Sequence, residues 1–408
     1  MTTVHLPWGA WYQDETIALR FPAKLAVDVL KPTGAASMDK ASIAAAIASP
    51  TDSKQLSDLA IGRRSACIVV DDMARPTQAA EILAPVISEL LEAGISESKI
   101  DIVIATGSHG SLSTQEIAWK VGENISTRFR VQSHNCRSGM VSTGIQYGDQ
   151  ELRVNQTFMN ADLRIAVGSV LPHSFAGYSG GAKLILPGIV DLSSISRSHK
   201  FVQLGLRGGA DPNANGFRTE AEQIARQLGL EFVVCVVTGP ARETTDVFCG
   251  DIVEAHRAAC QSARSAFATP LTRTYDCAVL NAYPKDCDLV QAANAFVAWK
   301  TAKQPVVRQD GLVILATACS QGIGHHGLFD PTGISYRKPG PLRHLRGREL
   351  WLYVPALTTQ EVHQLYSDQY RVFRNPGDLE AALELRLPPK STVAVFPCAP
   401  MQQVQDQR

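Results

Sequence analysis

A strand-like run leads directly into a glycine-rich segment, Leu163-Arg-Ile-Ala-Val-Gly-Ser-Val170 followed by Leu171-Pro-His-Ser-Phe-Ala-Gly-Tyr-Ser-Gly-Gly-Ala-Lys-Leu-Ile-Leu-Pro-Gly-Ile-Val190. The short apolar run with β-branched residues predicts a buried strand. Gly177, Gly180 and Gly181 allow the backbone that follows to bend sharply and to approach a ligand closely. Because ligands of open α/β sheets bind outside the carboxyl ends of the strands, this stretch indicates both a fold and a site.

Similar strands alternate with helical patterns along the rest of the chain. Strands are predicted at residues 65–70, 100–105, 163–170, 232–237, 276–280, 312–316, 349–354 and 392–396. Helices are predicted at residues 78–92, 219–228, 251–268, 359–366 and 378–387. A further helix is predicted to begin at the capping box Ser113-Thr-Gln-Glu116, and another, after Tyr283, is predicted to end at Trp299. This alternation predicts an α/β fold with two domains, each a mainly parallel sheet covered by helices.

The segment Pro270-Leu-Thr-Arg-Thr274 is a plausible boundary between the two domains. It gives an N-terminal cofactor-binding domain of residues 1–270 and a C-terminal α/β domain of residues 271–408, with the option that the last strand or tail packs back on the first domain. The active site is expected in the cleft between the domains, where such sites commonly form.

Composition excludes several classes of protein. The 408 residues carry 39 Lys and Arg against 39 Asp and Glu, so no global basic field attracts nucleic acid or a membrane surface. No apolar run approaches a membrane span, and the N-terminus lacks the pattern of a secretory signal. The 9 cysteines are scattered without a CxxC pair, which is typical of reduced, mostly buried thiols in a cytoplasmic protein.

Lys183 is the most reactive side chain in the glycine-rich segment. An amine among aliphatic neighbours loses hydration, so its pKa falls and it becomes a usable nucleophile. Ser179 and the N–H groups of Gly180 and Gly181 could line a phosphate. A phosphate-binding P-loop is excluded, because Leu184 stands where that motif needs a hydroxyl. The alternative is an ordinary turn with a solvated lysine.

Polar residues follow several of the predicted strands. Arg75 could hold a carboxylate or phosphate in a two-point grip, or form a local salt bridge with Asp71 or Asp72. Asp72 could accept sugar hydroxyls, or cap the helix that begins near Pro76. Tyr283 lies in an equivalent position after a strand of the second half. Their shared position at strand ends favours a functional cluster.

Histidines occupy two of these strand ends and three further positions. His109 and His173 suggest a general acid/base pair. His199 is a candidate metal ligand, although no HExxH or Cys/His cluster accompanies it. His325 and His326 are adjacent in a predicted loop, and they allow a weaker alternative, a metal hydrolase.

Gln291 and Asn294 lie one turn apart on the helix that follows Tyr283, so they share a helix face. Both could reach a substrate in the cleft between the domains. The alternative is a solvated face.

Together these motifs resemble those of the nickel-dependent lactate racemase family. The resemblance covers nearly the whole chain, and its most specific motif is the glycine-rich lysine segment. The matching residues are Asp72-x-x-Arg75-Pro, Gly107-Ser-His109, His173-x-Phe-Ala-Gly-Tyr-Ser-Gly-Gly-Ala-Lys183-x-x-x-Pro-Gly, His199, Tyr283-Pro and Leu289-Val-Gln291.

The resemblance implies a cofactor and roles for these residues. The cofactor is a nickel pincer nucleotide, pyridinium-3,5-bisthiocarboxylic acid mononucleotide, attached covalently to Lys183 with His199 completing the nickel coordination. His109 and His173 act as the acid/base pair, and Arg75 orients the substrate carboxylate. A 2-hydroxy acid is inverted at C2 by hydride transfer through a 2-oxo acid, and enzymes of cofactor synthesis are the implied partners.

Three departures from the family pattern point to a different substrate. The lactate enzymes carry a lysine where this chain has Asn294, and their His-Arg-Pro and Asp-x-Thr-Arg motifs become His109-Gly-Ser111 and Asp72-Met-Ala-Arg75. A neutral amide with the small residues Gly110 and Ala293 would suit a larger, hydroxyl-rich acid. An aldonic acid such as gluconate is the leading candidate; lactate, another short-chain 2-hydroxy acid, or a non-catalytic nucleotide carrier are the alternatives.

Overall fold

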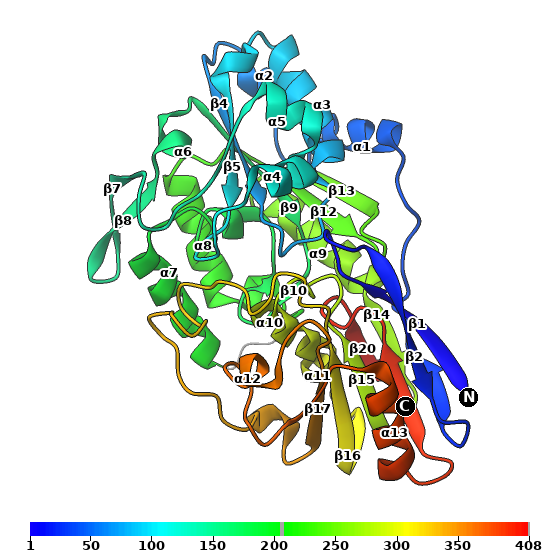
Figure 1. The fold of residues 1–408 in the computed structure, drawn as a ribbon. Helices are drawn as coiled ribbons and strands as arrows, with labels where there is room; N and C mark the ends of the chain where they lie inside the picture. The colour runs from blue at the N-terminus through cyan, green and yellow to red at the C-terminus, as the bar shows by residue number, and fades with distance from the viewer. Residues whose placement is uncertain (205–207, 407–408) are drawn as a thin grey trace. The chain divides into compact units, whose positions relative to one another are not determined.

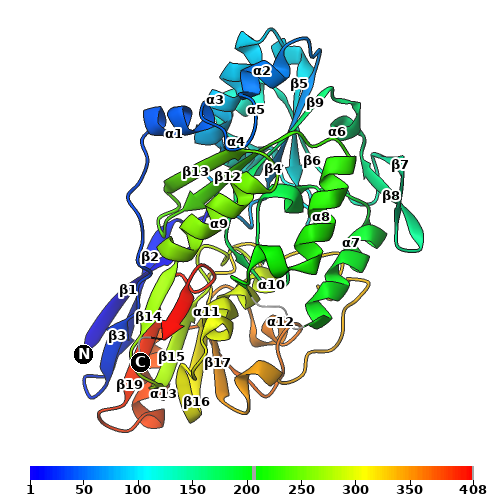
Figure 2. The same cartoon turned by 180° about the vertical axis from the view of Figure 1, so that it is seen from behind.

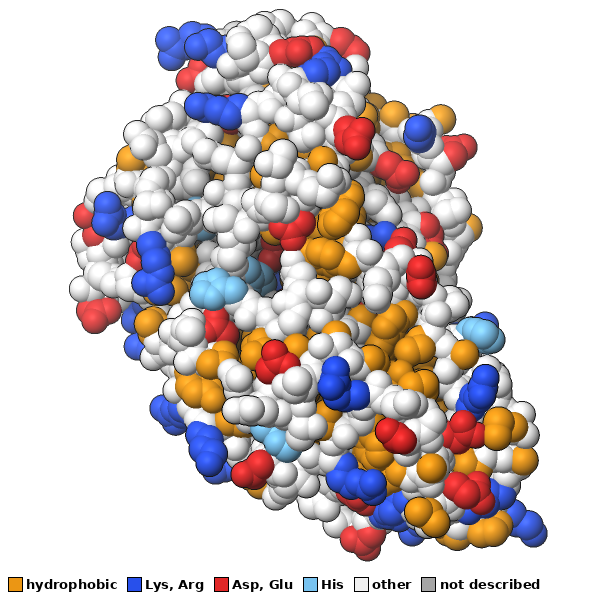
Figure 3. Space-filling model, viewed as in Figure 1, with side chains coloured by type: hydrophobic (Ala, Val, Ile, Leu, Met, Phe, Trp, Pro, Cys, Tyr) orange, Lys and Arg blue, Asp and Glu red, His pale blue; other side chains and the backbone are white. Residues whose placement is uncertain are grey.

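The computed structural model describes residues 1–204 and 208–406 (Figure 1). The chain divides into two compact units, one formed by Ala35–Arg264 and the other by Met1–Gly34 with Ser265–Arg408. No helix within the described ranges is both long and apolar enough to cross a bilayer. Lys and Arg side chains are interspersed with Asp and Glu over the face shown in Figure 3, as expected from the zero net charge.

The unit of residues 35–264 is built on a six-stranded sheet with the order β13-β12-β9-β4-β5-β6. All neighbours are parallel except β12 and β13. The strands are β4 (Ala66–Asp71), β5 (Ile100–Ala105), β6 (Arg130–Ser133), β9 (Leu163–Ser169), β12 (Phe232–Thr238) and β13 (Thr244–Gly250). The four strands predicted in this region are confirmed, and β6 and β13 are additional.

Helices and a hairpin complete this unit. The helices are α1 (Lys40–Ile47), α2 (Leu56–Ala60), α3 (Ala79–Glu92), α4 (Thr114–Val121), α5 (Glu123–Arg128), α6 (Gln156–Asn160), α7 (Leu192–Ser198), α8 (Gly216–Gln227) and α9 (Glu254–Ala266). The hairpin pairs β7 (Met140–Tyr147) with β8 (Gln150–Asn155). The predicted capping box at Ser113 and Glu116 is present at the start of α4.

Successive side chains along each strand point to opposite faces of this sheet. Ile68, Ile102 and Ile165 point to one face and pack against apolar residues of α1 and α3. On the opposite face Gly168 lies against Leu184, so the turn that carries the predicted site covers that side of β9. Helix α8 contacts the same turn and is visible on this side of the sheet in Figure 2.

The other unit contains an all-parallel six-stranded sheet with the order β18-β17-β16-β15-β19-β3. Its strands are β3 (Ala26–Val29), β15 (Tyr275–Asn281), β16 (Val307–Ala316), β17 (Glu349–Tyr353), β18 (Arg371–Phe373) and β19 (Thr392–Phe396). Smaller pairs are β1 (Thr2–Trp8) with β2 (Glu15–Phe21) and β14 (Ala268–Leu271) with β20 (Gln403–Asp406). The helices are α10 (Leu289–Ala292), α11 (Phe296–Thr301), α12 (Thr359–Val362) and α13 (Pro376–Arg386).

Both faces of this second sheet are covered. Leu280 and Leu315 contribute to a core with residues of α10 and α11, while Val279 and Ile314 contribute to a core with α13 and the β1–β2 hairpin. The predicted α/β architecture with two parallel sheets is therefore confirmed.

The two compact units do not contain the same residues as the two domains predicted from a boundary at residue 270. Residues 1–34 group with the C-terminal half because β3 pairs with β19 and the β1–β2 hairpin packs on the same sheet. The last strand, β20, pairs in parallel with β14, which lies in this same unit. Pairing between strands so distant in sequence leaves no local signal in either segment.

Candidate active site

The glycine-rich segment forms a tight turn on the sheet of residues 35–264. It contains β10 (Pro172–His173), β11 (Gly177–Tyr178) and the 3-10 turn η2 (Gly181–Leu184), and η2 contacts β4, β9 and β12. Gly180 and Gly181 have φ of 76° and 57°. A Cβ at Gly180 would lie 3.0 Å from Val170, and one at Gly181 would lie 3.1 Å from the His256 ring. Glycine is therefore required here by close packing as well as by backbone conformation.

Ser179 holds this turn to the end of β9. Its hydroxyl donates to the carbonyl oxygen of Ser169 at 2.7 Å and accepts from the N–H of Leu171 at 2.9 Å. The structure thus gives Ser179 an internal scaffold role, and the cofactor contact predicted for it, Gly180 and Gly181 stays a prediction.

Buried side chains from α8 and α9 fix the carbonyl groups of the turn. Arg218 is fully buried and donates to the carbonyl oxygens of Tyr178 and Gly180, the latter at 2.9 Å. The His256 ring contacts the carbonyl oxygen of Ser179 through Nε2 at 2.9 Å. Three successive carbonyl groups are thereby held in place immediately before the residues that carry Lys183.

Phe175 brings three of the predicted site residues together. Its ring centroid lies 4.7 Å from that of His173 and 5.0 Å from that of His199, both in edge contacts. Lys183 places its Nζ 5.9 Å from the centre of the same ring. The predicted base, metal ligand and attachment lysine therefore surround one aromatic side chain, itself packed on Phe217 at 4.9 Å.

The electrostatic setting of Lys183 favours a neutral amine. Burial of the amine and the nearby cations Arg75 and Arg218 hold the pKa of Lys183 well below its usual range, against the opposing effect of Asp72. A lowered pKa increases the fraction of the amine that carries the lone pair a nucleophile needs. The alternative of an ordinary solvated lysine does not fit these surroundings.

His199 is held as a neutral imidazole. Nδ1 lies 2.8 Å from the carbonyl oxygen of Ile195, a contact in which the ring nitrogen must donate, so the lone pair lies on Nε2. Burial lowers the pKa of His199 to about 4, and Lys183 and His109 add to the effect. Within residues 1–204 and 208–406 no three His, Cys, Asp or Glu side chains form a metal-binding group. A metal at His199 would need further donors from outside the protein.

His109 and Asp72 are in side-chain contact beyond the carboxyl ends of neighbouring strands. The Nδ1 of His109 contacts a carboxylate oxygen of Asp72, which is buried. Burial would raise the pKa of Asp72, but His109, Arg75 and Lys120 hold it below its usual range. The proposed capping role is wrong, since α3 has Gln78 as its N-cap.

Arg75 does not form the local salt bridge considered above. Its guanidinium donates to the carbonyl oxygen of Ala74 at 3.0 Å, and no carboxylate in the described part of the chain lies within 4.0 Å of it. Donors therefore remain for an anionic group of a ligand.

The buried pair Asp71 and Lys120 was not identified from the sequence. Their ion pair is 2.7 Å long, and the Lys120 side chain is fully buried. Asp71 is the last residue of β4, close to where site residues occur, whereas Lys120 lies in the last turn of an amphipathic helix, where a lysine is ordinarily solvated.

Tyr283, Gln291 and Asn294 belong to the other compact unit. The Tyr283 hydroxyl donates to Asp14 at 3.3 Å. Asn294 donates to the backbone and side-chain oxygens of Gln291 at 2.8 and 3.2 Å, which confirms that the two share a face. Gln291 is only 8% exposed, so the alternative of a fully solvated face is wrong for it. Substrate contacts by these residues stay predictions.

The adjacent histidines of the hydrolase alternative serve a local turn. His325 pairs with Asp330 at 2.8 Å, and the N–H of His326 donates to the same carboxylate at 2.6 Å. Their partner is one aspartate, and no metal-binding group is found there within the described residues. The structure gives no support to a metal hydrolase.

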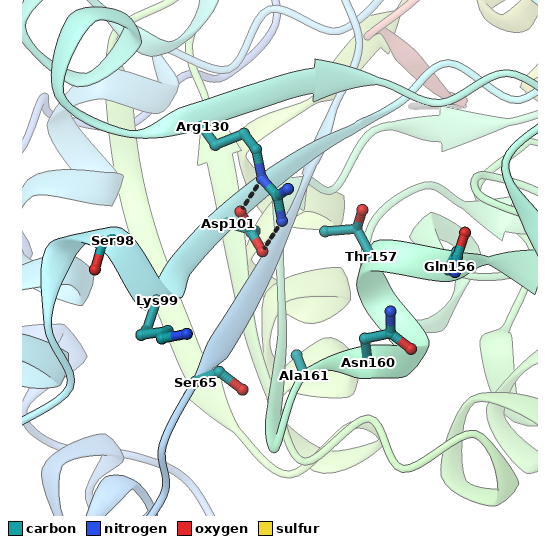
Figure 4. A pocket seen from close by; sticks show the side chains of 9 residues that line it. All are labelled: Ser65, Ser98, Lys99, Asp101, Arg130, Gln156, Thr157, Asn160 and Ala161. Atoms are coloured by element: carbon teal, nitrogen blue, oxygen red, sulfur yellow. Dashed lines mark hydrogen bonds and ion pairs between the residues drawn. The ribbon is translucent and has the colours of Figure 1, made fainter.

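A polar pocket lies at the amino ends of β4, β5 and β6, the opposite edge of the sheet from Asp72 and His109 (Figure 4). Arg130 reaches across it to Asp101 through two hydrogen bonds of 2.5 and 2.6 Å. None of the predicted site residues lines it.

Comparison with known proteins shows sequence similarity to lactate racemases. The family model described as the lactate racemase N-terminal domain matches residues 12–206. The lactate racemase of Thermoanaerobacterium thermosaccharolyticum is 28% identical over 290 residues, 70% of this chain and 67% of that protein. The lactate racemase of Lactiplantibacillus plantarum is 27% identical over 288 residues, 69% of this chain and 66% of that protein.

Two solved structures share the fold. The lactate racemase apoprotein from T. thermosaccharolyticum has a TM-score of 0.78 at 23% identity, covering 99% of this chain and 100% of that one. A crystal structure of a Thermotoga maritima protein has a TM-score of 0.67 at 16% identity, covering 91% of this chain and 99% of that one. The two curated relatives are racemases by name, and one solved structure of the same fold is a lactate racemase apoprotein. The chain is therefore similar in sequence to lactate racemases and shares the fold of the lactate racemase apoprotein.

Proposed function

We propose that this protein is a nickel pincer cofactor-dependent racemase or epimerase that inverts C2 of a 2-hydroxy acid. The observation that carries the proposal is the grouping of His173, His199 and Lys183 around Phe175. Two curated relatives are named lactate racemases, which supports a 2-hydroxy acid as the substrate class.

The residues of the site fit the cofactor implied by the family resemblance. Lys183 offers an amine whose pKa is lowered by burial and by two nearby cations, which suits covalent attachment. His199 offers a neutral imidazole with its lone pair on Nε2, which suits a metal that receives its other donors from the nucleotide. When bound, this group supplies an acceptor for the hydride removed from C2.

The protein side chains would orient the substrate and move its proton. Arg75 binds the carboxylate, because its guanidinium has no carboxylate partner in the described residues. One imidazole of His109 and His173 would take the proton of the C2 hydroxyl while the C2 hydride would pass to the bound group, so that a 2-oxo acid is left. After the other face of the carbonyl is presented, C2 would regain the hydride and the second imidazole would return a proton to the oxygen. Two bases are needed because the two enantiomers place their hydroxyl groups on opposite sides.

We infer that the substrate is larger than lactate, with an aldonic acid such as gluconate as the leading candidate. Asn294 provides a neutral amide, already hydrogen-bonded to Gln291, where the family resemblance implies a cation. Such a pair of amides can donate to and accept from substrate hydroxyl groups. Tyr283 is assigned to the same group of substrate contacts.

The proposal is tested by mass spectrometry and isotope labelling. Protein produced together with the enzymes of cofactor synthesis should carry a mass adduct on the peptide containing Lys183, and a Lys183→Ala variant should lack it. With C2-deuterated gluconate or lactate, the inverted product should retain deuterium at C2. Complete exchange of this label with solvent would instead show proton abstraction and contradict hydride transfer.

The engagement of Asn294 with Gln291 also favours a second candidate, a carrier that binds the nucleotide without turnover. It predicts a nickel-loaded protein that inverts no acid in a panel of short hydroxy acids and aldonic acids. Inversion of a single member of the panel would exclude it.

We further propose a cytoplasmic location. The 9 cysteines, all within the described residues, form no disulfide, and 8 of them are buried, which is typical of a reducing compartment.

A further inference from the structure

We propose that Lys120 and Asp71 form a buried clamp that positions Arg75 and the strand end leading to His173, so that Lys120 is a positioning residue for binding of the substrate carboxylate. This inference rests on the proposed function. Neither residue touches the reacting atoms; each acts through the loops it holds.

The ammonium group of Lys120 contacts both Asp71 and the loop that follows β4. Besides the ion pair with Asp71, its Nζ donates to the carbonyl oxygens of Arg75 and Thr77, both at 3.2 Å. An ammonium group has three donors, and the carbonyl oxygens of Arg75 and Thr77 accept from it beside the ion pair with Asp71. Both carbonyl groups belong to the loop after β4, on either side of Pro76. The backbone of Arg75 is therefore fixed from beneath by a side chain of α4.

Asp71 carries the clamp to a second strand. One of its oxygens accepts from the Thr77 hydroxyl at 2.6 Å and from the N–H of Ser169 at 2.8 Å. Ser169 ends β9, and its carbonyl oxygen accepts from Ser179 in the turn that carries Lys183. The same carboxylate thus joins the loop of Arg75 to the strand that leads to His173.

The burial of the Lys120–Asp71 ion pair indicates that the pair fixes the position of the loop that carries Arg75. Burial lowers the pKa of Lys120 while Asp71 opposes the shift. Removing two charges from water is costly, and apolar residues in the same space often stabilise a fold equally well. A buried ion pair that also satisfies two loop carbonyls instead defines one arrangement of the loop.

The direct test compares Lys120→Met with Lys54→Met, a matched control at an exposed position of the same unit. In the loaded enzyme, Lys120→Met should raise KM for the hydroxy acid about tenfold or more with a smaller change in kcat, because carboxylate binding is lost in the ground state and the transition state alike. The control should change neither constant.

A double-mutant cycle then asks whether Lys120 acts through Arg75. In an Arg75→Ala background, Lys120→Met should add less than about a twofold further effect, since the group it positions is already absent. Independent, multiplying effects would overturn the inference. If the wild-type enzyme inverts no hydroxy acid, the proposed function fails instead, so the two failures are distinguishable.

Unfolding of Lys120→Met would be detected by calorimetry. In that case Thr77→Val, which removes one donor to Asp71 and keeps the buried charges, takes its place. It should raise KM in the same direction by a smaller factor while melting cooperatively. An unchanged KM in folded Thr77→Val would overturn the inference.

Discussion

The carboxylate of Asp72 pairs with Nδ1 of His109 across the carboxyl ends of β4 and β5, two adjacent parallel strands. A buried carboxylate in this position holds the imidazole in one orientation and directs Nε2 as the basic nitrogen. Asp72 therefore supports the predicted base His109 in the free protein, whatever contact it makes to a bound nucleotide.

Asp72→Asn should lower kcat about 100-fold or more, because an amide cannot stabilise the imidazolium and can favour the wrong tautomer. The measurement is steady-state racemisation, with cofactor loading checked by mass spectrometry. Asp58→Asn, an exposed carboxylate of the same unit, is the control. A loss of activity explained fully by lost cofactor would contradict the role through His109.

Phe175→Leu should lower kcat while leaving the protein folded. Leucine keeps the site apolar but removes the ring edge contacts to His173 and His199, so both imidazoles lose a common support. Phe175→Ala should in addition reduce the free energy of unfolding by about 3–5 kcal/mol. Denaturant unfolding and kinetics are compared with Phe329→Leu, which replaces an exposed ring; equal effects at the two positions would refute the prediction.

His134 should make the fold sensitive to acid. Its neutral ring contacts the Val190 carbonyl oxygen through Nε2 at 2.9 Å, and burial lowers its pKa to about 4. The unfolded value is about 6.5, so the folded state binds fewer protons between these values. The stability this group contributes is complete above pH 6.5 and is lost as pH falls toward 4, with a slope of at most about 1.4 kcal/mol per pH unit.

Thermal unfolding of the wild type and of His134→Gln between pH 4 and 7.5 measures this contribution. The variant should be less stable at pH 7 and should lose less stability on acidification. If the stability of the two proteins falls equally as the pH is lowered, a group other than His134 causes the loss of stability in acid.

Asn294→Lys should shift selectivity toward short hydroxy acids. A lysine can bind a carboxylate by its charge. It cannot accept hydrogen bonds from the hydroxyl groups of a larger substrate, as the neutral amide of Asn294 can. We expect the ratio of kcat/KM for lactate to that for gluconate to rise about tenfold or more. Asn294→Gln, which keeps an amide, should leave the ratio near the wild-type value; a similar shift in both variants would argue for a steric cause.

Much of the fold is predictable because the central strands are continuous apolar runs. Ala66–Asp71 and Ile100–Ala105 are buried almost throughout, and helix α3 has a clear apolar stripe. β13 is harder to predict, because Thr244–Gly250 mixes polar and apolar residues in an antiparallel edge strand. The placement of β3 depends on β19, more than 360 residues later in the chain, and no local pattern encodes such a pairing.

The candidate site also contains some residues that sequence patterns indicate and others that only the tertiary structure reveals. His109, His173, His199 and Lys183 could be proposed from the sequence because reactive residue types follow predicted strands or lie in a specific motif. Lys120 could not, since a lysine on a short helix of mixed composition is ordinarily solvated and only tertiary packing buries it. The internal use of Ser179 was equally hidden, because its partners Ser169 and Leu171 are defined by the turn and not by composition.

The return of β3 to β19 has a consequence for biosynthesis. When residues 35–264 have left the ribosome, that unit holds all the strands of its own sheet, whereas the first 34 residues must wait for almost the entire chain. During translation the leading hairpin is therefore an unsatisfied apolar segment, and a nascent chain released before residue 392 would expose it to chaperones and proteases.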